Sequence, residues 1–106
     1  MYISQLLDTV RKVEKFTAGF DFQKFSADEK TQSAVILQLM LVGEIAKQLS
    51  EQAKKKIDLP WKEIVGFRDK AIHNYFGIDL EIVWQTVKDD IPKLKTGLQK
   101  GSKVQE

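Results

Sequence analysis

Apolar side chains recur every three or four residues in four separate stretches of the chain, and this period predicts amphipathic α-helices. The first stretch spans about Tyr2 to Ala18, and Gly19 is expected to end it. Its apolar stripe consists of Ile3, Leu6, Leu7, Val10, Val13 and Phe16. Polar residues then alternate with Phe20, Phe22 and Phe25, but no other segment offers a second strand. We therefore expect a connecting loop that packs its aromatic rings.

The second stretch opens with Ser26-Ala27-Asp28-Glu29, a capping-box pattern in which the Ser26 hydroxyl and the Glu29 carboxylate satisfy free amides at a helix start. The predicted helix continues to about Lys54. One apolar seam consists of Val35, Leu39, Val42, Ala46 and Leu49, and a neighbouring one consists of Ile36, Met40 and Gly43. Because a helix with so wide an apolar surface contacts several others, we expect this one to be central.

The third stretch follows Asp58-Leu59-Pro60, since proline fits the first turn of a helix. Phe76-Gly77 should end it, and its apolar side includes Trp61, Ile64, Val65 and Ile72. Asp79 can cap a fourth helix, in which Pro92 can introduce a kink. The inward-facing residues of that helix are Leu80, Val83, Val87, Ile91, Leu94 and Leu98.

Four amphipathic helices with short connections predict an all-α, antiparallel up-and-down four-helix bundle. A chain of 106 residues is expected to hold one domain, here residues 1–100, followed by a flexible tail over 101–106. Cysteine is absent, which excludes disulfides and thiolate metal sites. The apolar run from Ala34 to Gly43 is far shorter than the roughly 20 residues that cross a bilayer, and no signal peptide is evident. We therefore expect a soluble, cytoplasmic protein that does not contact a membrane.

The net charge of +2 is too small for the whole protein to attract nucleic acid, so any RNA contact must be local. The run Lys54-Lys55-Lys56 could guide RNA, although a solvated helix end is the commoner explanation of such a run. Glu44 lies in the apolar middle of the second helix, where it can support an arginine of a site or face water.

Residue types that carry chemistry are concentrated in one segment, Arg68-Asp69-Lys70-Ala71-Ile72-His73-Asn74-Tyr75. On one continuous helix, at about 100° per residue, Arg68 and Tyr75 share a face, whereas His73 lies about 140° from Arg68. Asp69 stands four residues before His73 and is in position to orient its imidazole. The plain alternative is structural: a capping or packing histidine, a half-buried tyrosine and an exposed ion pair.

This segment resembles the Arg-x4-6-His signature of HEPN domains, and more closely the Arg-x4-His-x-Tyr form of HepT-like toxins. The resemblance extends to Tyr75-Phe76-Gly77-Ile78-Asp79, Val83-Trp84, Gly43-Glu44 and Trp61. HepT-like sequences usually carry asparagine after the arginine, whereas this chain has Asp69, whose charge would repel phosphate. The resemblance implies an endoribonuclease toxin, a homodimer, and a minimal nucleotidyltransferase as antitoxin partner.

Metal-free cleavage of RNA needs a base for the ribose 2′-hydroxyl, an acid for the leaving 5′-oxygen and a cation for the phosphate. One histidine cannot easily serve as both acid and base, whereas a two-fold dimer would bring two copies of His73 and Arg68 to one cleft. On this hypothesis Arg68 and His73 are catalytic. The substrate-binding or supporting residues are Asp69, Asn74 and Tyr75. No metal or other cofactor is expected.

The resemblance further implies that Tyr75 is the hydroxyl to which the antitoxin transfers adenylyl groups. Two other interpretations stay open. The chain could be a non-catalytic helical subunit that binds a nucleotidyltransferase and nucleotide, and Asp69 favours this reading. It could also be a plain dimerisation module, which would show an exposed apolar patch without convergence of Arg68, His73 and Tyr75.

Overall fold

The computed structural model describes residues 1–101, apart from the side chain of Ile72, and every regular element in that range is helical. The α-helices are α1 (Tyr2–Thr17), α2 (Phe22–Ser26), α3 (Glu29–Gln48), α4 (Glu51–Lys56), α5 (Trp61–His73), α6 (Leu80–Gln85) and α7 (Ile91–Gly101). A 3-10 turn spans Tyr75–Gly77, and a π-helical turn spans Thr86–Asp90. The all-α prediction is confirmed. The predicted tail lies outside the described residues except for Gly101, which belongs to α7.

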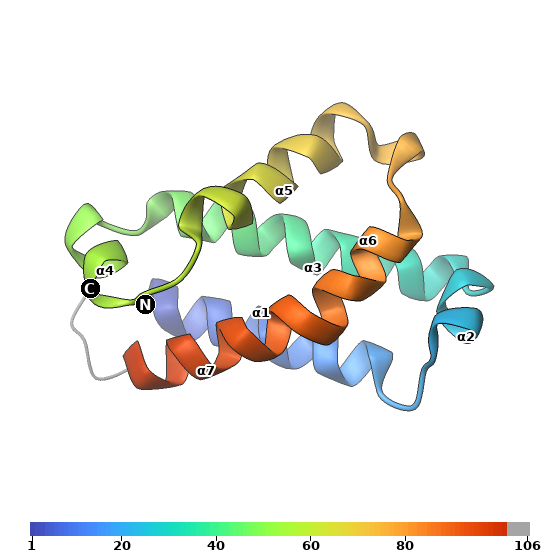
Figure 1. The fold of residues 1–106 in the computed structure, drawn as a ribbon, viewed down its shortest axis with the longest axis horizontal. Helices are drawn as coiled ribbons and strands as arrows, with labels where there is room; N and C mark the ends of the chain where they lie inside the picture. Colours follow the sequence, from blue (N-terminus) through green and yellow to red (C-terminus); the bar gives the residue numbers. More distant parts are fainter. Residues whose placement is uncertain (102–106) are drawn as a thin grey trace.

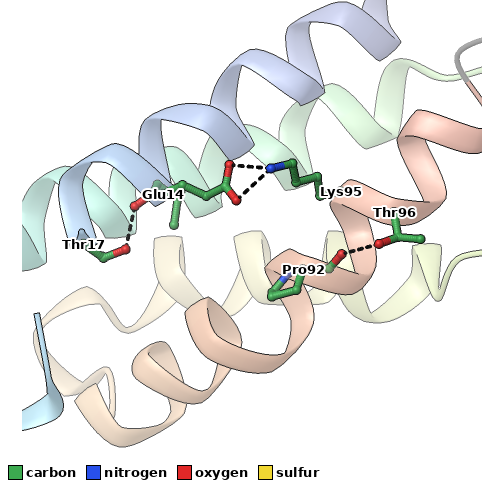
Figure 2. Close-up of polar contacts among 6 residues, drawn as sticks. Glu14, Thr17, Pro92, Lys95 and Thr96 are labelled. Carbon is green, nitrogen blue, oxygen red and sulfur yellow. Dashed lines mark hydrogen bonds and ion pairs between the residues drawn. The ribbon is translucent and has the colours of Figure 1, made fainter. Parts of the chain in front are cut away.

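Helix α3 occupies the middle of the molecule, with α5 on one side and α1 on the other (Figure 1), which confirms the predicted central helix. Helix α7 runs beside α1 (Figure 1). An ion pair also joins these two helices, since Lys95 Nζ lies 3.1 Å from Glu14 Oε2 (Figure 2). The stripes predicted for the first, second and fourth stretches form the core, which includes Leu6, Val10, Val13, Val35, Leu39, Val42, Val83, Ile91, Leu94 and Leu98. The third stripe differs, since Trp61, Ile64 and Val65 are only partly buried.

The start of the central helix differs from the predicted capping box. Asp28 is the N-cap, and its Oδ1 accepts a hydrogen bond from the Thr31 backbone N–H at 2.9 Å. This bond lowers the pKa of the Asp28 carboxyl, because it favours the charged form. Ser26 instead ends α2, a short helix where a loop was predicted. That helix forms because burying Phe25 against Trp84, with ring centroids 5.1 Å apart, fixes the segment.

The prediction that the central helix continues to Lys54 is wrong. It ends at Gln48, Leu49 adopts an extended conformation, and Ser50 caps α4 by accepting a hydrogen bond from the Ala53 backbone N–H at 3.0 Å. The break turns α4 back onto the body of the protein. Leu49, Ala53 and Ile57, which lie at and after the break, are all buried.

The predicted end of the third helix at Phe76-Gly77 is also wrong. Helix α5 ends at His73, where Asn74 leaves the helical conformation with φ −145° and ψ 51°. The predicted cap of the next helix is confirmed, since Asp79 Oδ1 accepts a hydrogen bond from the Glu81 backbone N–H at 2.9 Å. A π-helical turn precedes Pro92, whose ring nitrogen has no hydrogen to donate to the preceding turn.

None of the helices described here is long and apolar enough to span a membrane.

Candidate active site

The site is built where α5 crosses α3. Gly43 makes the close approach possible, because a Cβ atom at this position would collide with the Cβ of Arg68 and lie 3.0 Å from the backbone oxygen of Ile64. The next residue on α3, Glu44, is thereby placed beside the Arg68 side chain. The Gly43-Glu44 pair therefore fixes both the position of α5 and the surroundings of the guanidinium group.

Two carboxylates hold the Arg68 guanidinium group. Its Nε lies 2.9 Å from Glu44 Oε2, and its NH1 donates a hydrogen bond to Asp69 Oδ1 at 3.0 Å. The first contact is an ion pair without hydrogen-bond alignment, and Glu44 Oε2 is buried without a hydrogen-bond partner among the described residues. Arg68 is 26% exposed, and its NH2 has no partner within the described range. The planar group is thus oriented, with one edge left for a ligand.

His73 is the last residue of α5, and its side chain is exposed. The expectation that Asp69 orients this imidazole is not met, because the Asp69 carboxylate bonds to Arg68 instead. Within residues 1–101, no hydrogen bond or ion pair joins His73 to Arg68 or to Asp69. The imidazole is therefore open to solvent and to a ligand, and neither Arg68 nor Asp69 is its partner for proton transfer in the described part of the chain.

Asn74 and Tyr75 lie beyond the helix end. A Cβ atom at Gly77 would lie 2.5 Å from Asn74 Oδ1, so the Asn74 amide lies against Gly77 of the 3-10 turn, although Asn74 itself is exposed. Tyr75 is 41% exposed, and its hydroxyl donates to Ser33 Oγ on α3 at 3.4 Å. Because α5 has already ended, the helical angle that placed Arg68 and Tyr75 on one face does not apply to Tyr75.

Arg68 and Tyr75 contact α3 at well-separated points. Arg68 meets Glu44 and Tyr75 meets Ser33, eleven residues and about 16 Å apart along a helix that rises 1.5 Å per residue. The candidate residues are accordingly spread along one surface of α3 and α5. They do not converge on a closed pocket within the described part of this chain.

Within the range that the structure describes, no group of three or more histidine, aspartate or glutamate side chains is placed to hold a metal ion.

Comparison with known proteins identifies the family. The family model described as ribonuclease HepT-like matches residues 6–100. The chain belongs to the HepT-like ribonuclease family. It is 40% identical over 100 residues to "Probable ribonuclease HepT" of Thermococcus cleftensis, which covers 93% of this chain and 91% of that protein. It is 36% identical over 95 residues to "Putative RNase MJ1380" of Methanocaldococcus jannaschii, covering 89% and 87% of the two chains. No solved structure matches it significantly.

Sequence reasoning missed one feature of this HepT-like protein, an exposed apolar strip beside the site. Leu37 and Leu41 on α3 are 53% and 38% exposed, and Phe76 on the 3-10 turn is fully exposed. Helix α5 is thinly covered too, since among its described side chains only Ala71 is buried. The available signal was the position of Leu37 and Leu41, which lie outside the two apolar seams of the central helix.

Proposed function

We propose that this protein is a metal-independent endoribonuclease. The observation that carries the proposal is the exposed end of α5, where a carboxylate-oriented Arg68 and a solvent-open His73 lie on one helix in a member of a ribonuclease family. Arginine suits a phosphate because its planar fork can donate two hydrogen bonds to phosphate oxygens. Histidine suits proton transfer because imidazole exchanges its proton near neutral pH.

In the proposed reaction the ribose 2′-oxygen attacks the adjacent phosphorus and the bond from phosphorus to the 5′-oxygen breaks. A base removes the 2′-hydroxyl proton, and an acid protonates the departing 5′-oxygen. Arg68 compensates the charge that develops on the non-bridging oxygens. The products are a 2′,3′-cyclic phosphate and a 5′-hydroxyl fragment. Asp69, Asn74 and Tyr75 support the site or position the substrate.

Cleavage of an unstructured RNA in the presence of EDTA tests this chemistry. His73→Ala should lower the cleavage rate by a factor of about 10² to 10⁴, the usual contribution of a general acid or base. Lys70→Ala, an exposed residue on the same helix, is the matched control and should cleave as the unaltered protein does. Full activity of His73→Ala, or a requirement for added metal, would exclude the mechanism.

We infer that the working form is a homodimer. In each chain α1, α3, α5 and the segment formed by α6 and α7 would act as the four members of an up-and-down bundle. One chain provides a single histidine, and the reaction needs an acid and a base. The exposed strip of Leu37, Leu41 and Phe76 supports the inference, since apolar surface beside a site commonly marks an interface.

Sedimentation and activity together test the dimer. Leu37→Ser with Phe76→Ser should shift the protein to monomer and abolish cleavage, whereas Ile82→Ser, also an exposed apolar residue, should do neither. Mixing inactive Arg68→Ala and His73→Ala subunits provides a second readout. Recovered activity in the mixture supports a shared site, and a fully active monomer would contradict it.

We propose further that the protein is the cytoplasmic toxin of a pair with a nucleotidyltransferase antitoxin, which transfers an adenylyl group from ATP to Tyr75. The Tyr75 oxygen would attack the α-phosphorus and release pyrophosphate. Exposure of Tyr75 supports this step, because the ring is 41% exposed. Mass spectrometry after incubation with the partner and ATP should show one added adenylyl group, absent in Tyr75→Phe. An unchanged mass of the unaltered chain would exclude the modification.

One observation favours a second candidate, a non-catalytic subunit that binds a nucleotidyltransferase and nucleotide. The Asp69 carboxylate accepts a hydrogen bond from NH1 of Arg68 and places a negative charge where an RNA phosphate would approach. This candidate predicts nucleotide binding that depends on Arg68 and no cleavage of any RNA tested.

A further inference from the structure

A groove distinct from the candidate active site lies between the α4–α5 connection and α7. Its volume is about 680 Å³, and its lining is drawn from residues 56–60 and 92–100. Neither Arg68, His73 nor Tyr75 belongs to that lining. The groove brings together two segments that are more than thirty residues apart in sequence, so only the folded chain creates it.

Three lysines make the groove basic. Lys56 comes from the end of α4, and Lys93 and Lys100 come from α7, all three exposed. Asp58 is the acidic residue in the lining, so the groove keeps an excess of positive charge. The neighbouring Lys95, in contrast, pairs with Glu14 at 3.1 Å. The three groove lysines have no such carboxylate partner in the described part of the chain.

The walls of the groove are held in place before any ligand arrives. Trp61 Nε1 donates to the backbone oxygens of Lys54 at 3.1 Å and Ile57 at 3.0 Å, which fixes the α4–α5 connection. Leu59 packs against α7 where Gly97 has no side chain, and a Cβ atom at Gly97 would lie 2.8 Å from Leu59 Cδ2. The lysine stems therefore stand on a preformed surface, which reduces the entropy lost on binding.

We propose that this groove binds the sugar–phosphate backbone of the RNA substrate outside the segment that is cleaved, an inference that rests on the proposed ribonuclease function. Lysine ammonium groups act as point charges that bind phosphates without reading sequence. Lys93 and Lys100 are seven residues apart on α7, a separation of about 10 Å. Successive phosphates of one strand can therefore contact both ends of the groove.

RNA binding, measured by fluorescence anisotropy in a His73→Ala background, separates this role from cleavage. The groove variant combines Lys56→Gln, Lys93→Gln and Lys100→Gln. The matched control loses the same charge through Lys15→Gln, Lys24→Gln and Lys30→Gln. These control lysines lie on α2 and the adjoining ends of α1 and α3, at the opposite end of the molecule from α4 (Figure 1).

For an unstructured RNA of about 20 nucleotides, loss of three phosphate contacts should lower the slope of log affinity against log salt by about 2 and weaken binding about a hundredfold at 0.1 M salt. The control variant should bind at least tenfold more tightly than the groove variant.

If both variants bind the unstructured RNA equally while the unaltered protein still cleaves it, the proposed RNA-binding role of the groove is wrong and the proposed ribonuclease function stands. If the unstructured RNA binds through the groove but the unaltered protein does not cleave it, the proposed role of the groove is supported and the proposed ribonuclease function is wrong. Absence of RNA binding by the His73→Ala parent, or an acidic peptide that competes for the groove more tightly than RNA does, would overturn the assignment of RNA to this groove.

Discussion

Gly43 should be the glycine whose replacement most damages the site. In Gly43→Ala the new Cβ atom collides with the Cβ of Arg68 and lies 3.0 Å from the Ile64 backbone oxygen. Neither neighbour is the free end of a flexible side chain, so α5 itself must move. Overpacking of this kind costs about 1–3 kcal/mol, and the better helix propensity of alanine returns at most about 1 kcal/mol. The expected net loss of unfolding free energy is about 1–2 kcal/mol.

Gly66 provides the matched control, because it is also a glycine inside a helix but a Cβ atom there meets nothing within 4 Å. Gly66→Ala should stabilise the protein by about 0.5–1 kcal/mol through the unfolded chain. The contrast between the two variants, about 2 kcal/mol, corresponds to roughly 8–16 °C in Tm for a domain of this size. Circular dichroism melts measure it directly.

Cleavage assays extend the same comparison to the site. A shift of α5 by about 1 Å carries Arg68 with it, and a misplacement of that size lowers catalytic rates on the order of a hundredfold. Gly66→Ala should cleave at the unaltered rate. If Gly43→Ala melts at or above the temperature of Gly66→Ala, or cleaves RNA normally, then the crossing of α3 and α5 does not position Arg68 as described.

The remaining predictions follow from single contacts. Asp69→Asn should tighten RNA binding several-fold, because it removes the charge that competes with phosphate at Arg68; weaker binding of RNA would contradict this. Phe25→Ala should lower the unfolding free energy by about 3–5 kcal/mol, since Phe25 is fully buried. Denaturant unfolding monitored by the fluorescence of Trp84, which packs against Phe25, measures this loss. Because the pKa of Asp28 is lowered on folding from its ordinary value of 3.8, its charge stabilises the protein above that pH and the effect is lost as pH falls through the lower folded value. The unaltered protein should therefore be more stable than Asp28→Asn at neutral pH. The difference in unfolding free energy between the two should shrink as pH falls below 4.

Several expectations depended only on neighbours in sequence, and these were correct. The helical class, the stripes that contain Leu6 and Val83, and the Asp79 cap follow from the period of apolar residues and from side chains that reach their own backbone. The resemblance of the segment from Arg68 to Tyr75 to HepT-like proteins was likewise visible in the chain, and the family match confirms the family.

Other features were decided by contacts between distant segments. The helix breaks at Leu49 and Asn74 depend on what each segment meets in three dimensions, and so does the choice of Asp69 between Arg68 and His73. The capping-box prediction failed for the same reason, since packing of α2 left Ser26 inside one helix and Asp28 at the start of the next.

Amino-acid types and their spacing alone determined that this chain forms amphipathic helices with one histidine and one arginine close together on the third. Only the tertiary structure decided that Glu44 meets Arg68 across a glycine, and that Lys56 and Lys93 line one groove. Helical periodicity is a property of short segments, whereas the partner of a charged side chain depends on which helices cross and how closely.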